Sequence, residues 1–306
     1  MLHYGWSFPN AEKDRSDMKK TWIGFFMTAA LVFSACTGKP AEQSKASEAE
    51  TVTAAQTSTE EETIPETTHS EAARYLPIRR TVYDYCGNMF SATDYTYNSD
   101  FKVKSIGQDS GDIKFVTAYI YDEQGFLIRS EFQDETGTPL LVNIYENDEN
   151  GRPVFEFYGY PDGRAHNTYR YSYDEAGNLI QKDTFTEGDE TKLKERILYT
   201  FDDNGHTLTS ETQNGEGERT HFYEYIYDEA GVNTEIFYEH NGETQHTIID
   251  YKNGLEEKRR TYADGNMIKI THSEYDDEGN LIMLEDCNGH NEVQFTNVTI
   301  YGWVEP

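Results

Sequence analysis

The chain has 306 residues, with 26 Lys and Arg against 56 Asp and Glu and a formal net charge of −30. This balance excludes nucleic-acid partners, since affinity for a phosphate backbone comes mainly from basic side chains that displace counterions. It also disfavours flat adhesion to an anionic membrane surface. Because the chain contains 23 Tyr and 16 Phe beside so many charges, we expect sheets with bulky faces and polar turns.

The N-terminal segment is first basic and then apolar. Met18 is a better translation start than Met1, and initiation at Met18 would leave residues 1–17 out of the protein. Met18-Lys19-Lys20 is followed by an uncharged, mostly apolar run of thirteen residues, 21–33. Such a run rises only about 20 Å as a helix, too short for a hydrocarbon core of about 30 Å. We therefore predict a signal peptide over residues 18–35.

A cysteine follows this run in a distinctive setting. Phe33-Ser34-Ala35-Cys36 has small residues at the two positions before the cysteine and resembles the lipobox of bacterial lipoproteins. The resemblance implies cleavage after Ala35 and a lipid on Cys36, which would anchor the exported chain to the outer face of a bacterial membrane, exposed in the cell envelope. Phe33 departs from the leucine that the family prefers. A plain secretory peptide with an incidental cysteine is the alternative.

The next segment has a different composition. Residues 37–74 include no aromatic side chain, and Val52 and Ile64 are their only large aliphatic ones. Such a segment cannot bury enough apolar surface to offset the chain entropy lost on folding. We predict that residues 36–74 are the lipidated cysteine and a disordered tether.

From residue 75 onward aromatic residues return with a regular period. Between residues 115 and 301, Tyr-Asp or Phe-Asp, two residues and Gly recur in five phrases. Asp, Asn and Gly tolerate the left-handed conformations of hairpin turns, and the spacing leaves about six to eight residues for each strand. Less regular copies begin at Tyr145, Tyr251 and Tyr301, and weaker turn phrases lie between copies. The repeat-defining residues are Tyr121, Asp122, Gly125, Tyr173, Asp174, Gly177, Phe201, Asp202, Gly205, Tyr227, Asp228, Gly231, Tyr275, Asp276 and Gly279.

These phrases resemble the motif of the YD-repeat (Rhs-type) family, which is Tyr-Asp, two or three residues, Gly and an apolar pair. The resemblance covers residues 115–301 well and residues 75–114 loosely. In large members it implies antiparallel strands that wind into a hollow shell around a toxic C-terminal segment. This sequence has no Asp-Pro-x-Gly motif of the self-cleaving shells, and no cargo segment follows Trp303. The encapsulating role is therefore not expected.

The expected fold is all-β. We predict an N-terminal β cap or degenerate repeat over residues 75–114 and a YD-like β-repeat domain over residues 115–306. About sixteen strands in two-strand antiparallel units would form an extended sheet about 75 Å wide, twisted or curled into a partial spiral. Cys86 and Cys287 lie near opposite ends of this array, so two separate thiols are favoured over a disulfide.

The sequence contains no recognisable catalytic or cofactor motif. Acidic pairs such as Asp122-Glu123 recur at equivalent turns, whereas an active site is rarely repeated five times. There is no EF-hand loop, H-x-x-x-H pattern, P-loop or G-x-S-x-G phrase. Residues 202–205 and 147–151 come nearest to a calcium loop without matching it. We expect no enzyme activity and no cofactor, with calcium at the acidic turns left open.

The favoured function is a non-catalytic binding or adhesion module for glycan or protein partners, held in the cell envelope by the lipid on Cys36. Tyrosine rings offer flat apolar faces with a polar rim, which suit sugars and proteins, although tyrosine ladders are also ordinary cross-strand packing. A structural or accessory envelope protein is the first alternative. A glycan-acting hydrolase on the repeat scaffold is the second. The sequence leaves the ligand and the oligomeric state open.

The lipid anchor can be tested by replacing Cys36 with alanine. The Cys36→Ala chain has no thiol to receive a diacylglycerol, so we expect it to carry no fatty acid and to leave the membrane fraction. Labelling of cells with radioactive palmitate, followed by fractionation, makes the measurement. Cys86→Ala is the matched control and should remain labelled and membrane-bound. Full labelling of Cys36→Ala would contradict the prediction.

Overall fold

The structure is a computed structural model that describes residues 73–111 and 114–306. The predicted signal peptide, Cys36 and nearly all of the predicted tether lie outside the described residues. Within the described ranges, no helix is long and apolar enough to cross a membrane.

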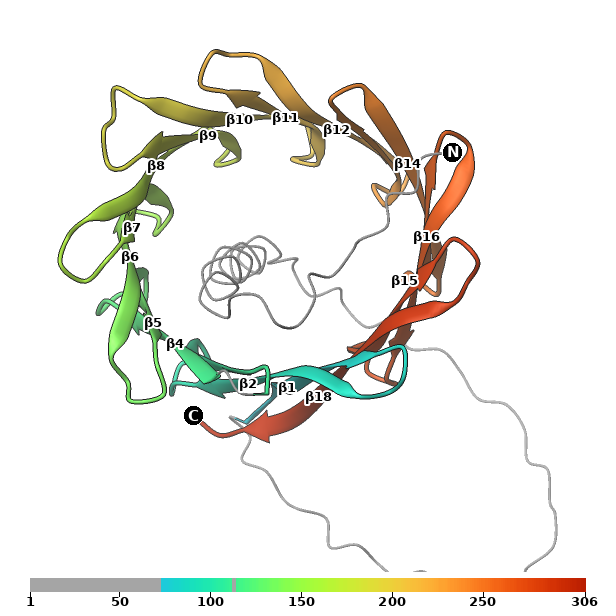
Figure 1. Ribbon diagram of the computed structural model, residues 1–306, viewed down its shortest axis with the longest axis horizontal. Helices are drawn as coiled ribbons and strands as arrows, with labels where there is room; N and C mark the ends of the chain where they lie inside the picture. Colours follow the sequence, from blue (N-terminus) through green and yellow to red (C-terminus); the bar gives the residue numbers. More distant parts are fainter. Residues whose placement is uncertain (1–72, 112–113) are drawn as a thin grey trace, which may run out of the picture. The chain divides into compact units, whose positions relative to one another are not determined.

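Eighteen β-strands follow one another along the described chain, and each pairs antiparallel with its neighbours in sequence (Figure 1). Short hairpin turns join most of them. The strands are β1 (Arg74–Asp84), β2 (Met89–Tyr97), β3 (Val103–Asp109), β4 (Lys114–Tyr121), β5 (Leu127–Gln133), β6 (Pro139–Asn147), β7 (Pro153–Gly159), β8 (Ala165–Tyr173), β9 (Leu179–Thr186), β10 (Leu193–Phe201), β11 (Thr207–Asn214), β12 (Arg219–Tyr227), β13 (Asn233–His240), β14 (Glu243–Lys252), β15 (Leu255–Ala263), β16 (Asn266–Tyr275), β17 (Leu281–Asn288) and β18 (Val293–Val304).

The sheet closes into a barrel because its first and last strands also pair. β1 lies antiparallel to β18, from Arg74 opposite Val304 to Asp84 opposite Phe295, so the described strands form a ring (Figure 1). The prediction of an open, extended or partly spiral repeat array is therefore wrong. Each hairpin adds a similar right-handed twist, and the accumulated curvature brings together two edges that would otherwise carry unpaired N–H and C=O groups.

The N-terminal segment supplies the strands that complete the ring. Residues 75–114, for which we predicted a cap or a degenerate repeat, contain nearly all of β1 together with β2 and β3. The turn after β2 is a copy of the repeat turn without its glycine. The Asn98 side chain accepts the N–H groups of Asp100 and Lys102 at 3.0 and 2.9 Å, and Phe101 has a left-handed φ of 61°.

Each full copy of the repeat phrase forms the same turn. After β4, the Asp122 carboxylate accepts the N–H groups of Gln124 and Phe126 at 3.0 and 2.8 Å. The N–H of Gly125 donates to the Asp122 carbonyl at 3.0 Å, with a φ of 82° at the glycine, where a Cβ would be strained. The turns at residues 148–152, 174–178, 202–206, 228–232 and 276–280 have the same backbone hydrogen bonds.

The copy assigned to Tyr145 is two residues out of phase. Its turn lies at residues 148–152, so Asn147 occupies the place that tyrosine has in other copies. The Asn147 side-chain amide donates to the Leu127 carbonyl at 2.8 Å. With Asn147 in this place, the intervals from Tyr121 and to Tyr173 are both 26 residues, where Tyr145 gave unequal ones.

The repeat tyrosines gather at one end of the barrel, called here the tyrosine end, which comprises the turns after β2, β4, β6, β8, β10, β12, β14 and β16. Tyrosine hydroxyls there donate to a carbonyl at the start of the neighbouring strand, as Tyr173 does to Pro153 at 2.9 Å. These bonds link successive hairpins across the wall. The other donor–acceptor pairs are Tyr97–Pro77, Tyr121–Val103, Tyr227–Thr207, Tyr251–Asn233 and Tyr301–Leu281.

A buried acid and a half-buried lysine lie among tyrosine rings on one face of the wall. Glu156 is only 2% exposed, and the Tyr171 hydroxyl donates to its Oε2 at 2.5 Å. Burial raises the pKa of Glu156 and lowers the pKa of Lys182. The Lys182 ammonium lies 4.5 Å from the centre of the Tyr169 ring. Packing within the wall is therefore dense enough to desolvate charged groups.

The two cysteines of the barrel are free thiols, Cys86 exposed and Cys287 buried. Closure brings them to the same end of the barrel, because Phe295 of β18 pairs with both Asp84 and Asp286. β18 still separates them, and two strand spacings amount to about 9.6 Å. A disulfide needs Cα atoms within about 7 Å. The prediction of two separate thiols is confirmed.

Removal of one linking hydroxyl should weaken the barrel measurably. We expect Tyr173→Phe to lower the free energy of unfolding by about 1 kcal/mol, because the Pro153 carbonyl loses its donor while the ring stays packed. Urea unfolding followed by circular dichroism makes the measurement. The matched control is Tyr85→Phe, whose side chain is 74% exposed and should contribute little. Equal effects of the two substitutions would argue against the hydroxyl link.

Alkaline pH should also destabilise the barrel. Burial raises the pKa of Tyr97, Tyr119 and Tyr169 to about 12, from an ordinary value of 10.0. Folding therefore favours the protonated phenols, and their contribution is complete below pH 10.0 and is lost as the pH rises to about 12. We expect the urea midpoint to fall over this interval together with a rise in phenolate absorbance. An unchanged midpoint would refute the expectation.

Candidate ligand-binding groove

All the repeat-defining residues from Tyr121 to Gly279 lie at the tyrosine end, in the turns after β4, β8, β10, β12 and β16 or at the strand ends before them. They are brought to one end, but they do not converge on a single point, because each group shapes its own turn. Cys36, the predicted lipid-attachment site, lies outside the described residues. Because the repeat residues serve the same structural role in each turn, a binding site is expected where one repeat differs from its neighbours.

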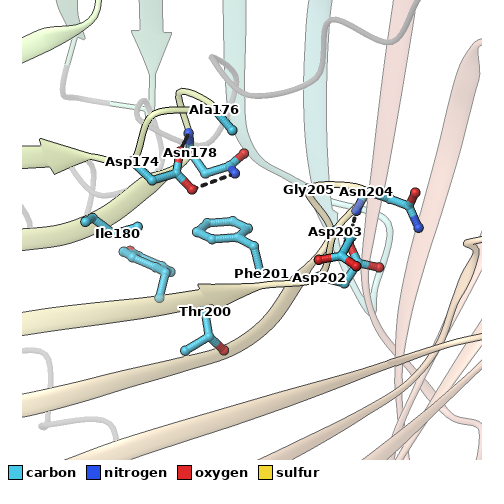
Figure 2. Close-up of a pocket in the computed structure, with 11 residues that line it drawn as sticks. Asp174, Ala176, Asn178, Ile180, Thr200, Phe201, Asp202, Asp203, Asn204 and Gly205 are labelled. Atoms are coloured by element: carbon cyan, nitrogen blue, oxygen red, sulfur yellow. Dashed lines mark hydrogen bonds between the residues drawn. The ribbon is translucent and has the colours of Figure 1, made fainter.

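A cavity of about 450 Å³ opens between the turns after β8 and β10. Its walls include the turn residues Asp174 and Asn178 on one side and residues 202–205 on the other. Figure 2 shows the Phe201 ring standing between the two turns. This volume falls within the range of roughly 300–1,000 Å³ that is usual for small-molecule sites. We call it the Phe201 groove.

Phe201 lacks the hydroxyl with which six tyrosines link hairpins at this end. On either side of it, Tyr173 and Tyr227 donate to the carbonyls of Pro153 and Thr207, at 2.9 and 2.8 Å. The carbonyl in the equivalent place beside Phe201 belongs to Leu179, which follows the preceding turn. A phenyl ring cannot donate to it, so the link between these two turns is missing.

In three other repeats, the residue that ends the turn is a cation or a histidine and lies over the aromatic ring of the next repeat. It also covers the glycine of that next turn. The pairs are Lys102 over Tyr121, Arg152 over Tyr173 and His206 over Tyr227, at 5.4, 4.6 and 4.9 Å from the ring centres.

Asn178 has this position before Phe201 and, like Arg152 and His206, it bonds to the aspartate of its own turn, but it carries no charge. Its side-chain amide donates to the Asp174 carboxylate at 2.9 Å (Figure 2). Throughout the described part of the chain, no cation and no second ring stacks on Phe201. The Phe201 ring is therefore half-buried without the cover that Tyr121, Tyr173 and Tyr227 have.

The groove is negatively charged. Hydrogen bonds from the side chains of Asn178 and His206 are the main cause of the lowered pKa values of Asp174 and Asp202, so both carboxyls are ionised at neutral pH. Asp203 is exposed and lies at the groove edge, where its carboxylate has no partner among the described side chains. No Lys or Arg belongs to the described lining.

The turns do not gather a metal site within residues 73–111 and 114–306, where no group of three or more His, Cys, Asp or Glu is placed to hold an ion. The Asp202 carboxylate is already engaged by the N–H of Asn204 and by both the N–H and the imidazole of His206. Calcium at the acidic turns remains a prediction without support from this geometry.

A second cavity, of about 810 Å³, lies between the turns after β2 and β4. The Lys102 ammonium donates to the Gly125 carbonyl there and lies over Tyr121. In this cavity, the protein's own cation therefore covers Tyr121, the counterpart of Phe201. In the Phe201 groove, by contrast, phenylalanine replaces the tyrosine and Asn178 replaces the cation.

Sequence reasoning found Phe201 as a repeat residue but missed the groove beside it. Two signals were present, namely phenylalanine where other full copies have tyrosine and Asn178 where Arg152 and His206 stand in neighbouring turns. Neither signal is sufficient alone, because Asn280 also follows a turn glycine and Tyr301 after it keeps its hydroxyl bond.

No protein-family model matches the chain, and no curated protein is significantly similar to it in sequence. Among solved structures, it is similar to the Tc holotoxin pore of Photorhabdus luminescens, at 16% identity and a TM-score of 0.33, covering 63% of this chain but only 12% of that one. A porin-like protein from Bacteroides uniformis has 13% identity and a TM-score of 0.42, with 74% and 96% of the two chains covered.

A porin-like protein from Bacteroides vulgatus has 12% identity and a TM-score of 0.36, with coverages of 75% and 99%. The identities are low, and none of the three comparisons assigns the chain to a family. At these TM-scores, none of the three likenesses carries an argument about function.

Proposed function

We propose that the barrel is a non-catalytic saccharide-binding module of a bacterial cell envelope and that the Phe201 groove holds the sugar. The observation that supports this is a bare aromatic ring, flanked by carboxylate and amide groups, in a cavity of about 450 Å³. A sugar ring has apolar C–H faces and a rim of hydroxyls. It can therefore stack on Phe201 while its hydroxyls bond to Asp203 and Asn204.

The charges of the groove favour binding over hydrolysis. A glycosidase needs one carboxyl that is kept protonated, usually by an apolar environment, to donate a proton to the leaving oxygen. Asp174 and Asp202 are instead held ionised by hydrogen bonds from Asn178 and His206. These carboxylates are suited to accepting hydrogen bonds.

The envelope location is part of the proposal and rests on the sequence before residue 75. A lipid on Cys36 followed by the predicted tether would hold the barrel away from the membrane surface. The net charge of −30 would keep the barrel from adhering to anionic lipid headgroups. The tether would thus leave the groove accessible to glycans outside the membrane.

Truncation of Phe201 should remove the stacking surface for a sugar. A glycan array probed with the full chain identifies the best-bound saccharide, and we expect Phe201→Ala to raise its Kd about tenfold, as loss of an aromatic contact commonly does. Calorimetric titration gives the Kd. Tyr85→Ala removes another exposed ring, outside the groove, and should leave the Kd unchanged. An array without any bound saccharide, or equal Kd values for Phe201→Ala and the unaltered chain, would refute the proposal.

A further inference from the structure

In two repeats beside the Phe201 groove, a side chain of the protein joins an aromatic ring to a carboxylate. The Arg152 guanidinium lies 4.6 Å from the centre of the Tyr173 ring and forms an ion pair of 2.6 Å with Asp148 of its own turn. A cation in this place is stabilised twice, by the electron-rich ring face and by the opposite charge.

His206 repeats this arrangement one hairpin beyond the groove. Its ring stacks on Tyr227 at 4.9 Å, and its Nδ1 lies 2.8 Å from the Asp202 carboxylate. The place between a turn aspartate and the next repeat's ring therefore accepts a planar guanidinium or an imidazole, each with a nitrogen directed at the carboxylate.

The Phe201 groove has the ring and the carboxylate of this arrangement but lacks the cation. Asn178 stands where Arg152 and His206 stand, and its neutral amide bonds to Asp174 at 2.9 Å (Figure 2). The cavity occupies the space in front of Phe201. The negative charge of Asp174 is thus matched only by a neutral amide among the described side chains.

We infer that the saccharide bound in the Phe201 groove is an amino sugar with a free, protonated amine. This inference rests on the proposed function and names the ligand class of that site. The ammonium takes the place over Phe201 that Arg152 takes over Tyr173, with Asp174 beside it. Acidic sugars are repelled by Asp174, Asp202 and Asp203, and an acetylated amine has no charge to contribute.

Two short oligosaccharides that differ only in acetylation test the inference. The probes are oligomers of glucosamine and of N-acetylglucosamine, titrated calorimetrically into the full chain in mildly acidic buffer. The amine is charged there, and the lowered pKa values keep Asp174 and Asp202 ionised. We expect the glucosamine oligomer to bind about tenfold more tightly, because its ammonium both lies over a ring and pairs with a carboxylate.

A matched pair of substitutions locates the amine. Asn178→Arg supplies the groove with the protein's own cation, and we expect it to weaken binding of the glucosamine oligomer about tenfold or more. Asn280→Arg is the control, because Asn280 bonds to Asp276 through its N–H and amide at 2.7 and 3.0 Å, as Asn178 does to Asp174. Asn280 lies in the turn after β16, outside the groove, so its replacement should leave the Kd unchanged. Urea midpoints of both variants establish that they fold.

The other possible results contradict either the amino-sugar inference or the proposed function. Equal Kd values for the two oligomers, or a Kd for the glucosamine oligomer that Asn178→Arg leaves unchanged, would overturn the amino-sugar inference. If neither oligomer binds but a neutral or acidic glycan does so through Phe201, the inference fails and the proposed function stands. If no saccharide binds the full chain at all, the proposed function itself fails.

Discussion

The pairing of β1 with β18 is the constraint on which the whole architecture depends. An antiparallel sheet of hairpins satisfies its internal hydrogen bonds locally, but each outer strand is left with a row of free N–H and C=O groups. Here the row on Arg74–Asp84 is satisfied by β18. A closed wall of eighteen strands has too large a circumference for its side chains to meet in one central core. Its stability must therefore come from contacts between neighbouring strands.

Those contacts explain why the repeat has the residues it has. The tyrosine ring packs against its neighbours in the wall while its hydroxyl reaches the adjacent hairpin, as in Tyr173 and Pro153. The turn glycine provides a left-handed φ and also leaves room for the side chain above it. A Cβ on Gly151 would lie 2.2 Å from the Phe126 ring. Even charged groups are buried by this packing, since Glu156 is 2% exposed.

Turn chemistry and spacing were readable from the sequence because they depend on neighbouring residues. Asp122 and Gly125, for example, identify a turn without reference to the rest of the chain. Closure was not readable, because it depends on curvature summed over all the hairpins and on the pairing of β1 with β18, which lie far apart in the sequence. The correct position of the repeat copy at Asn147 was hidden because the Asn147 amide replaces a tyrosine hydroxyl as hydrogen-bond donor. The groove was hidden because it results from contacts that Phe201 and Asn178 do not make.

Antiparallel closure also restricts how such a protein can change in length. Going round the ring, strand direction alternates, and β1 and β18 can meet antiparallel only if the number of strands is even. Loss or gain of a single strand would reverse the direction of the last strand relative to β1 and break the antiparallel pairing that closes the ring. Gene duplication or deletion in this lineage should therefore proceed by whole hairpins, which would widen or narrow the ring in steps of two strands and leave its handedness and its two rims intact.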